Sequence, residues 1–234
     1  DLKAKKILDE VYLKGVCSDP FYELHTNNTL IFSSDCPEPV DSCFCTLVGG
    51  KPYCELQFDL NFSPAKDGYV VEIGSDEGEK IVNQAHAFFI DVTNDELTLR
   101  DKSRKNALDR LDKINSEFSS IKTANLQNVL NTKFQSDYWK DASKNCVQCT
   151  GCNNICPSCY CFYLTEAAES KIRFLDSCHY ASYARVAGGM NTRAKVYERF
   201  RNRYECKFNY RMKNFGIYGC SGCGRCISAC PRKI

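Results

Sequence analysis

Cysteines gather in two segments of this chain, and in both segments they follow the spacing C-x2-C-x2-C-x3-C-P. The first copy contains Cys146, Cys149, Cys152, Cys156 and Pro157, and the second contains Cys220, Cys223, Cys226, Cys230 and Pro231. Thiolates at this spacing bind [4Fe–4S] clusters in bacterial proteins with two clusters, where the fourth cysteine of each copy ligates the cluster of the other copy.

This rule assigns the ligands crosswise between the two copies. Zinc is the rival interpretation, but zinc sites take pairs of ligands separated by a spacer and not three ligands in tight series. We therefore expect two neighbouring [4Fe–4S] clusters that pass single electrons. Cluster 1 is expected on Cys146, Cys149, Cys152 and Cys230, and cluster 2 on Cys220, Cys223, Cys226 and Cys156.

Small residues inside the two runs fit the same role. Gly151, Gly222 and Gly224 let backbone amides approach the inorganic sulfides, and hydrogen bonds of that kind raise the reduction potential. The alternative is that these glycines only permit tight turns, and the two interpretations are compatible.

Nine further cysteines lie outside the two runs. The loop "CPEPVDSCFC" places Cys36, Cys43 and Cys45 within ten residues, one ligand short of a cubane. We expect a third [4Fe–4S] cluster there, and the alternative is a loop with inert thiols. Its fourth ligand is expected from Cys159, Cys161 or Cys178. Isolated cysteines are usually small buried hydrophobes, and this interpretation is given to Cys17, Cys54 and Cys206.

Composition narrows the function. The chain has 234 residues, 17 cysteines and a net charge of +2, which does not suit a general polyanion binder. No apolar run approaches the roughly 20 residues of a membrane span. The odd count and tight spacing of the cysteines disfavour disulfides and favour a reducing, cytoplasmic setting.

Residues 193–213 are rich in lysine and arginine, and we expect a solvated helix face, with a docking surface or nucleic-acid contact as alternatives.

No catalytic machinery is visible in the sequence. There is no G-x-G-x-x-G after a strand, so we expect no flavin or nicotinamide bound by this chain. No nucleophile stands beside a base, and no catalytic residue is assigned. Three histidines, His25, His86 and His179, share no metal-ligand spacing. His179 is expected to be a satisfied buried side chain.

The elements that must position the cysteines predict an α+β protein. A mixed domain at 1–95 is followed by a helical segment at 96–145 and a mostly helical dicluster domain at 146–234, with an insertion at 157–219. Helices are expected near "LDEVYL", after Ser75 or Asp76, across 96–139, at "TEAAESKIRF" and in the basic stretch. Strands are expected at 29–34 and 68–75.

The ordered set of motifs resembles a known family. The segments are "DCPEPVDSCFCTLVGG", "FDLNFSPAKDGYVVEIGSDEG", "CVQCTGCNNICPSCYCF", "DSCHYASYARVAGGMNTR" and "GCSGCGRCISACP". They resemble the iron–sulfur beta subunit of cytoplasmic sulfhydrogenase-type [NiFe] hydrogenases, a broad family that includes the iron–sulfur subunit of anaerobic sulfite reductase. The resemblance covers nearly the whole chain and also implies further sequence before Asp1 and after Ile234.

The resemblance implies a non-catalytic electron-transfer subunit. It would connect a flavin subunit that handles NAD(P)H to a catalytic metal subunit, within a hetero-oligomer that involves no nucleic acid and no membrane span. By resemblance, the CFC loop and the CYC or DSC segments hold the third cluster. The alternatives are a subunit that serves sulfite or sulfur reduction, or a stand-alone reductase whose third cluster binds substrate.

Overall fold

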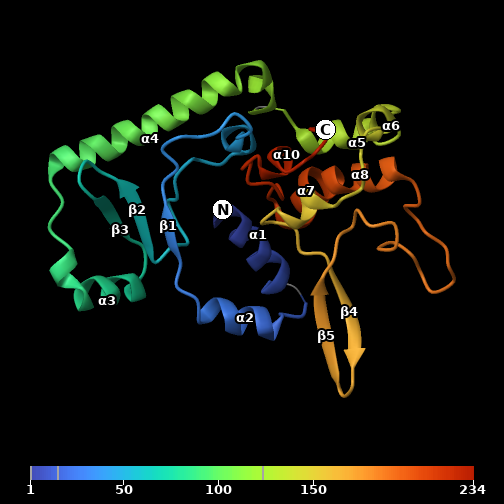
Figure 1. Cartoon of the computed structure of the whole chain (residues 1–234), viewed down its shortest axis with the longest axis horizontal. Coiled ribbons are helices and arrows are strands. Elements are labelled where there is room, and N and C mark those ends of the chain that lie inside the picture. The colour runs from blue at the N-terminus through green and yellow to red at the C-terminus, as the bar shows by residue number, and fades with distance from the viewer. Residues whose placement is uncertain (1, 15, 123) are drawn as a thin grey trace. The chain divides into compact units, whose positions relative to one another are not determined.

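The computed structural model describes residues 2–14, 16–122 and 124–234, and Asp1, Gly15 and Thr123 lie outside the described residues. The chain forms two compact units, unit 1 (Asp1–Lys122) and unit 2 (Thr123–Ile234). The division falls within the segment 96–145, which was predicted to be a helical connection. Helices and strands occur together, as an α+β protein requires (Figure 1).

Unit 1 combines helices with a small sheet. Its helices begin at residues suited to capping: Ser75 accepts a hydrogen bond from the Gly78 amide, and Thr93 and Glu96 form a capping box. The predicted helix start at Ser75 is confirmed. The helices are α1 (Leu2–Tyr12), α2 (Pro20–Asn27), α3 (Asp76–Gln84) and α4 (Asn94–Ile114), with 3₁₀ turns η1 (Cys45–Val48), η2 (His86–Phe88) and η3 (Ser116–Lys122).

The sheet of unit 1 has the strand order β1 (Phe32–Ser34), β2 (Leu60–Pro64) and β3 (Tyr69–Ile73). β1 pairs with β2 in parallel and β2 pairs with β3 in antiparallel fashion. The predicted strands at 29–34 and 68–75 are confirmed within shorter bounds. β2 was not predicted, because it follows a turn-rich stretch and carries two buried polar residues, Asn61 and Ser63.

An ion-pair network joins α4 to the sheet. Arg104 pairs with Asp35 at 2.7 Å and with Glu72, while Asn61 and Ser63 also donate to the Asp35 carboxylate. Burial by itself raises the pKa of Asp35, but these hydrogen bonds outweigh burial and hold the pKa below its usual value. The residue before Cys36 is therefore fixed to both α4 and β2.

Unit 2 contains both cysteine runs. Its helices are α5 (Leu126–Lys133), α6 (Tyr138–Ser143), α7 (Gly151–Asn154), α8 (Val196–Glu205), a π-helical turn η4 (Cys206–Tyr210), α9 (Arg211–Phe215) and α10 (Arg225–Ser228). Its core centres on Trp139 of α6, whose ring meets Phe200 and Tyr204 of α8. The Trp139 indole donates to the Lys133 carbonyl at 2.9 Å, so the buried ring has no unpaired polar atom.

The helix predicted at "TEAAESKIRF" is wrong. This segment forms a hairpin of β4 (Phe162–Ala167) and β5 (Ser170–Leu175), paired from Phe162–Leu175 to Ala167–Ser170. Alanine and glutamate favour a helix locally, but the aromatic and β-branched residues on both sides pair across the two-residue turn at Ala168, which takes φ +52°. The insertion between the runs is therefore a hairpin followed by helices.

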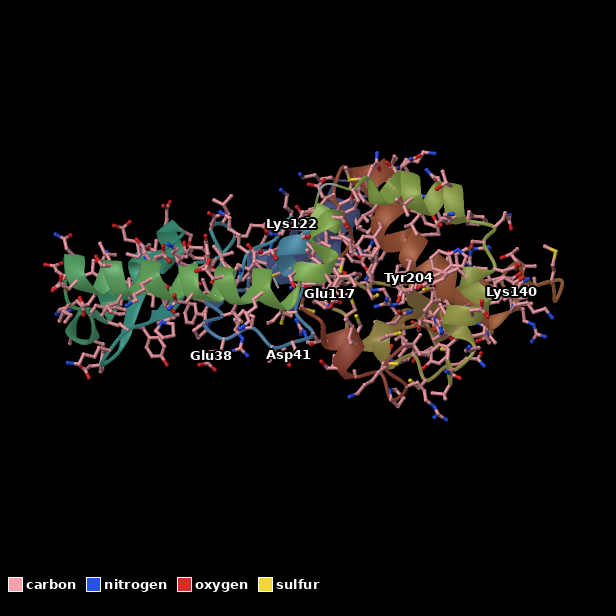
Figure 2. The ribbon with its side chains drawn as sticks, turned by 90° about the horizontal axis from the view of Figure 1, so that it is seen from above. Glu38, Asp41, Glu117, Lys122, Lys140 and Tyr204 are labelled. Atoms are coloured by element: carbon pink, nitrogen blue, oxygen red, sulfur yellow. The ribbon has the colours of Figure 1, made fainter. Side chains whose placement is uncertain are left out.

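Across the described residues, no helix combines the length and apolar character that crossing a bilayer requires. All 17 cysteines carry free thiols. The side chains of unit 2, including Tyr204 of α8 and Lys140 of α6, are shown in Figure 2.

Candidate iron–sulfur site

The two cysteine runs take the same backbone course. Gln148 and Gly222, each two residues after the first cysteine, have φ values of +56° and +68°, and Thr150 and Gly224 have +59° and +70°. A short helix follows in each case, α7 from Gly151 and α10 from Arg225. Positive φ at a non-glycine residue costs about 1–3 kcal/mol, and such residues are concentrated at functional sites. The first run therefore holds a strained conformation that glycine provides at little cost in the second.

A cavity of about 60 Å³ lies between the runs, and cysteines of both runs line it. Its sulfur lining comes from the first three cysteines of the first run and from the last two of the second. The sulfur-bearing residues are Cys146, Cys149, Cys152, Cys226 and Cys230. The structure thus brings Cys230 to the cavity of the first run, together with all three cysteines assigned to cluster 1.

Most of the remaining lining is apolar or cationic. Phe200 and Tyr204 of α8 and Pro231 of the second run contribute ring surface, and Arg203 contributes a buried guanidinium. Burial raises the pKa of the Cys152 thiol, although the charge of Arg203 opposes the rise. Because thiolates are the iron ligands, a nearby buried cation favours the form that binds metal.

Cys220 lies within electrostatic reach of Cys156 and Cys226, although Cys226 also lines the cavity of the first run. The Gly222 amide donates to Cys220 Sγ at 3.4 Å. Burial raises the pKa of Cys223, but hydrogen bonds from Arg225 and Ser221 outweigh it, so the net pKa is lowered. These are the cysteines assigned to cluster 2.

Cys156 differs from the other thiols in its partners. Lys207 Nζ donates to its sulfur at 3.1 Å, and Lys207 itself is almost fully buried. The pKa of Cys156 is lowered to about 3, first because the Cys159 thiol donates to it and also because of the Lys207 charge. The buried Lys207 ammonium therefore favours the thiolate of Cys156, the form that binds iron.

The glycines assigned to the cofactor lie beside these sulfurs. A Cβ at Gly151 would come 3.7 Å from Cys149 Sγ, and Gly222 and Gly224 take left-handed conformations. Gly222 supplies one amide-to-sulfur hydrogen bond.

The prediction that the basic stretch forms a solvated helix face is wrong for four of its residues, which form one buried stripe. Arg199, Arg203, Lys207 and Arg211 are buried, with exposures between 2% and 6%. Their spacing of four residues was a signal in the sequence, because residues four apart share one helix face. The helix turns this face toward the segments that carry the cysteines.

The CFC loop belongs to unit 1. Cys36, Cys43 and Cys45 lie within electrostatic reach of one another, since burial first and then the charge of Cys43 raise the pKa values of Cys36 and Cys45. Asn115 at the end of α4 donates to the Cys43 carbonyl at 2.9 Å and tethers the loop. The loop also carries the exposed carboxylates Glu38 and Asp41 (Figure 2).

The three cysteines considered as fourth ligand of this loop belong to unit 2. Cys161 and Cys178 are hydrogen-bonded to each other, and Cys178 also accepts from Asn153 at 3.4 Å. Cys159 Sγ lies 3.4 Å from Lys207 Nζ.

Cys17 is exposed, so its interpretation as a buried hydrophobe is wrong, while Cys54 and Cys206 are half-buried.

Within the described ranges, no three His, Cys, Asp or Glu side chains converge on one point in the way a single metal ion requires. A [4Fe–4S] cluster requires a different arrangement, because each cysteine sulfur binds a different iron atom. The four cysteine sulfurs are therefore further apart than the ligands of a single metal ion. The sulfur-lined cavity with its neighbouring cations fits that donor set.

These features define a class of protein. The family model described as a 4Fe-4S dicluster domain matches residues 145–234, which contain both runs. Unit 2 thus carries a [4Fe–4S] dicluster domain.

A relative extends the assignment to the whole chain. The sulfhydrogenase 2 subunit beta of Pyrococcus furiosus is 34% identical over 240 residues, which cover 100% of this chain and 68% of that protein. The chain belongs to the family of sulfhydrogenase beta subunits, and the resemblance drawn from its ordered motifs is confirmed. No solved structure matches the chain.

Proposed function

We propose that this chain is the electron-transfer subunit of a multi-subunit oxidoreductase and that its two cysteine runs exchange their fourth ligands. Cluster 1 is held by Cys146, Cys149, Cys152 and Cys230, and cluster 2 by Cys220, Cys223, Cys226 and Cys156. The observation that carries the proposal is a cavity lined by the first three cysteines of one run and by Cys226 and Cys230 of the other.

The chain's own residues hold and insulate the clusters. [4Fe–4S] clusters supply one-electron transfer when bound. Phe200, Tyr204 and Pro231 keep water from the first site, and amides such as that of Gly222 donate to ligand sulfurs. Because each run serves both sites, the two clusters lie close together, which suits sequential transfer of single electrons.

The proposal includes partners and a third cluster. A flavin subunit that handles NAD(P)H and a catalytic metal subunit would flank this chain in a hetero-oligomer, in keeping with a relative that is itself named as a beta subunit. Cys36, Cys43 and Cys45 would hold the third cluster, with a fourth ligand from Cys159, Cys161 or Cys178. The many free thiols support a reducing, cytoplasmic compartment.

Four alanine variants test the crosswise ligation. Electron paramagnetic resonance of the reduced full chain should show that Cys146→Ala and Cys230→Ala alter one cluster signal, and that Cys220→Ala and Cys156→Ala alter the other. Iron should be about eight per chain from the two runs, or about twelve with the third cluster, since each cluster contains four irons. Cys17→Ala, at an exposed thiol outside the runs, is the matched control.

Ligation within each run predicts a different pairing. Cys156→Ala would then alter the signal that Cys146→Ala alters, and the crosswise proposal would be wrong. Purification of the natural complex tests the functional role. Flavin-binding and metal-binding subunits should co-purify, and substrate turnover by the isolated chain with an artificial electron donor would contradict a role in electron transfer alone.

A further inference from the structure

A stripe of four buried cations runs along the helical segment from α8 to α9. Arg199, Arg203, Lys207 and Arg211 recur every four residues, and each is at most 6% exposed. In a regular α-helix, residues four apart drift around the axis by about 40° per step. The π-helical turn at Cys206–Tyr210 contains more residues per turn, so it offsets this drift and keeps the stripe on one face.

The polar partners of the stripe are mostly neutral. Arg199 donates to the carbonyls of His179, Arg193 and Ala194, and Arg203 donates to Asn153 and the Cys152 carbonyl. Arg211 stacks on Tyr160, while its Nε and Nη1 atoms are buried without a hydrogen-bond partner. In the part of the chain that the structure describes, none of the four forms an ion pair with a carboxylate. Buried cations without anions are unfavourable, so the arrangement fits an anionic group beside the stripe.

Lys207 makes the most direct contacts with sulfur. Its ammonium donates to Cys156 Sγ at 3.1 Å and Cys159 Sγ at 3.4 Å, and also to Ser158 Oγ at 3.1 Å and the Gly219 carbonyl at 3.3 Å. The Ser158 and Gly219 oxygens are neutral and hold the ammonium in place. Of the four acceptors, only the two sulfurs can carry a negative charge. The lysine is therefore placed to act on the cysteine that the first run contributes to cluster 2.

We infer that Lys207 is a positioning residue that raises the reduction potential of the cluster held by Cys156, above the value that the four thiolates alone would give. This inference rests on the proposed function, because it requires a cluster on Cys156. Reduction adds one negative charge to the cluster. A fixed, desolvated cation hydrogen-bonded to a ligand sulfur stabilises that extra charge more than it stabilises the oxidised form. Arg203 is directed to the backbone beside Cys152 and acts less directly.

The test is a redox titration of the full chain, followed by electron paramagnetic resonance, in Lys207→Met, Lys207→Gln and Lys207→Arg. The cluster held by Cys156 is identified as the one whose signal changes in Cys156→Ala. In Lys207→Met and Lys207→Gln, the equilibrium constant for reduction of this cluster should fall about tenfold, which lowers its potential by about 59 mV for one electron. The other cluster should shift less, and Arg should retain most of the wild-type potential.

Lys213→Met is the matched control, because Lys213 is an exposed lysine of α9. It removes the same charge and should leave both potentials unchanged. The inference is overturned if Lys207→Met titrates like Lys213→Met, or if both clusters shift equally. It is also overturned if Met and Gln both lose the cluster while Lys213→Met keeps it, since Lys207 would then serve assembly and not potential. A wild-type chain without two clusters would instead refute the proposed function itself.

Discussion

Nε2 of His179 lies 3.4 Å from Sγ of Cys146, and the imidazole is almost fully buried. Its Nδ1 atom has no hydrogen-bond partner in the described structure, so the predicted burial of His179 is confirmed but the expectation that its polar atoms are satisfied is wrong. Burial, followed by the charges of Arg199 and Arg203, lowers the pKa of His179 to about 4. Once Cys146 ligates a cluster as a thiolate, it can only accept, so the neutral ring carries its proton on Nε2. In that state His179 donates to the first cysteine of the first run.

Replacing His179 should lower the reduction potential of the cluster that Cys146 ligates. His179→Phe preserves much of the ring volume and removes the donor, which contributes about 1 kcal/mol to the reduced form. His179→Gln retains a donor and should shift the potential less. Redox titration measures both, and His86→Phe, at an exposed histidine, is the control. An unchanged potential in His179→Phe would show that the contact does not act on the cluster.

Arg104→Met should destabilise unit 1. The substitution leaves the Asp35 carboxylate buried with only Asn61 and Ser63 as donors, and breaking such a pair costs about 3 kcal/mol or more. Hydrogen exchange of the β2 amides should accelerate by about two orders of magnitude. Arg110→Met, at an exposed position on the same helix, should change exchange little. Equal protection in the two variants would show that the ion pair contributes nothing.

The Asp35 carboxylate should also make the stability of unit 1 depend on pH in the acidic range. The folded pKa of Asp35 is below its unfolded value of about 3.9, so its contribution is fully present above that pH and is lost as the pH falls toward the folded pKa. Urea unfolding of unit 1, followed by circular dichroism, should show wild type losing its advantage over Asp35→Asn in this window. A constant difference between the two proteins down to about pH 3 would contradict this assignment.

Trp139→Ala should loosen the packing of α6 on α8. The indole contacts Phe200 and Tyr204, and removing a buried tryptophan side chain costs about 3–5 kcal/mol. Thermal unfolding monitored by circular dichroism should shift to lower temperature, and the α8 amides should exchange faster. Tyr138→Ala removes the neighbouring exposed ring and should have a much smaller effect. If the two variants unfold alike, Trp139 is not the anchor of this interface.

Cys43→Ala tests the third cluster. We expect iron to fall by about four per chain while both dicluster signals persist, because the CFC loop belongs to unit 1. Cys54→Ala, at a half-buried thiol of the same unit, is the control and should leave the iron content unchanged. Unchanged iron in Cys43→Ala would reject a cluster on this loop.

Cysteine spacing is a local property, so both runs could be located in the sequence, and the rule for this spacing predicts Cys230 as a ligand of the first cluster. In the structure Cys230 lines the same cavity as the first three cysteines of the first run, while its role as a ligand stays a prediction. The cap at Ser75 was equally local. In contrast, the β4–β5 hairpin depends on pairing between Phe162 and Leu175, which overrides the helix preference of the residues between them.

The buried stripe could not be predicted from the sequence, for a different reason. Lysine and arginine are mostly exposed in proteins, so a basic helix favours a solvated face. Only the fold shows that Arg199 and Lys207 face inward, because their acceptors come from segments far away in the chain, such as Ser158 and His179. The four-residue recurrence of the cations was visible, but its meaning depended on the cysteine segments opposite.

The buried stripe also bears on how the chain matures. Without its clusters, unit 2 must enclose four buried cations that form no ion pair with a carboxylate among the described residues, whereas unit 1 balances Arg104 with its own carboxylates. The free energy of binding the two clusters of the dicluster domain then becomes folding free energy for unit 2. We expect iron starvation to leave a molecule whose first half is folded while its second half stays open, ready for cluster insertion and exposed to proteases.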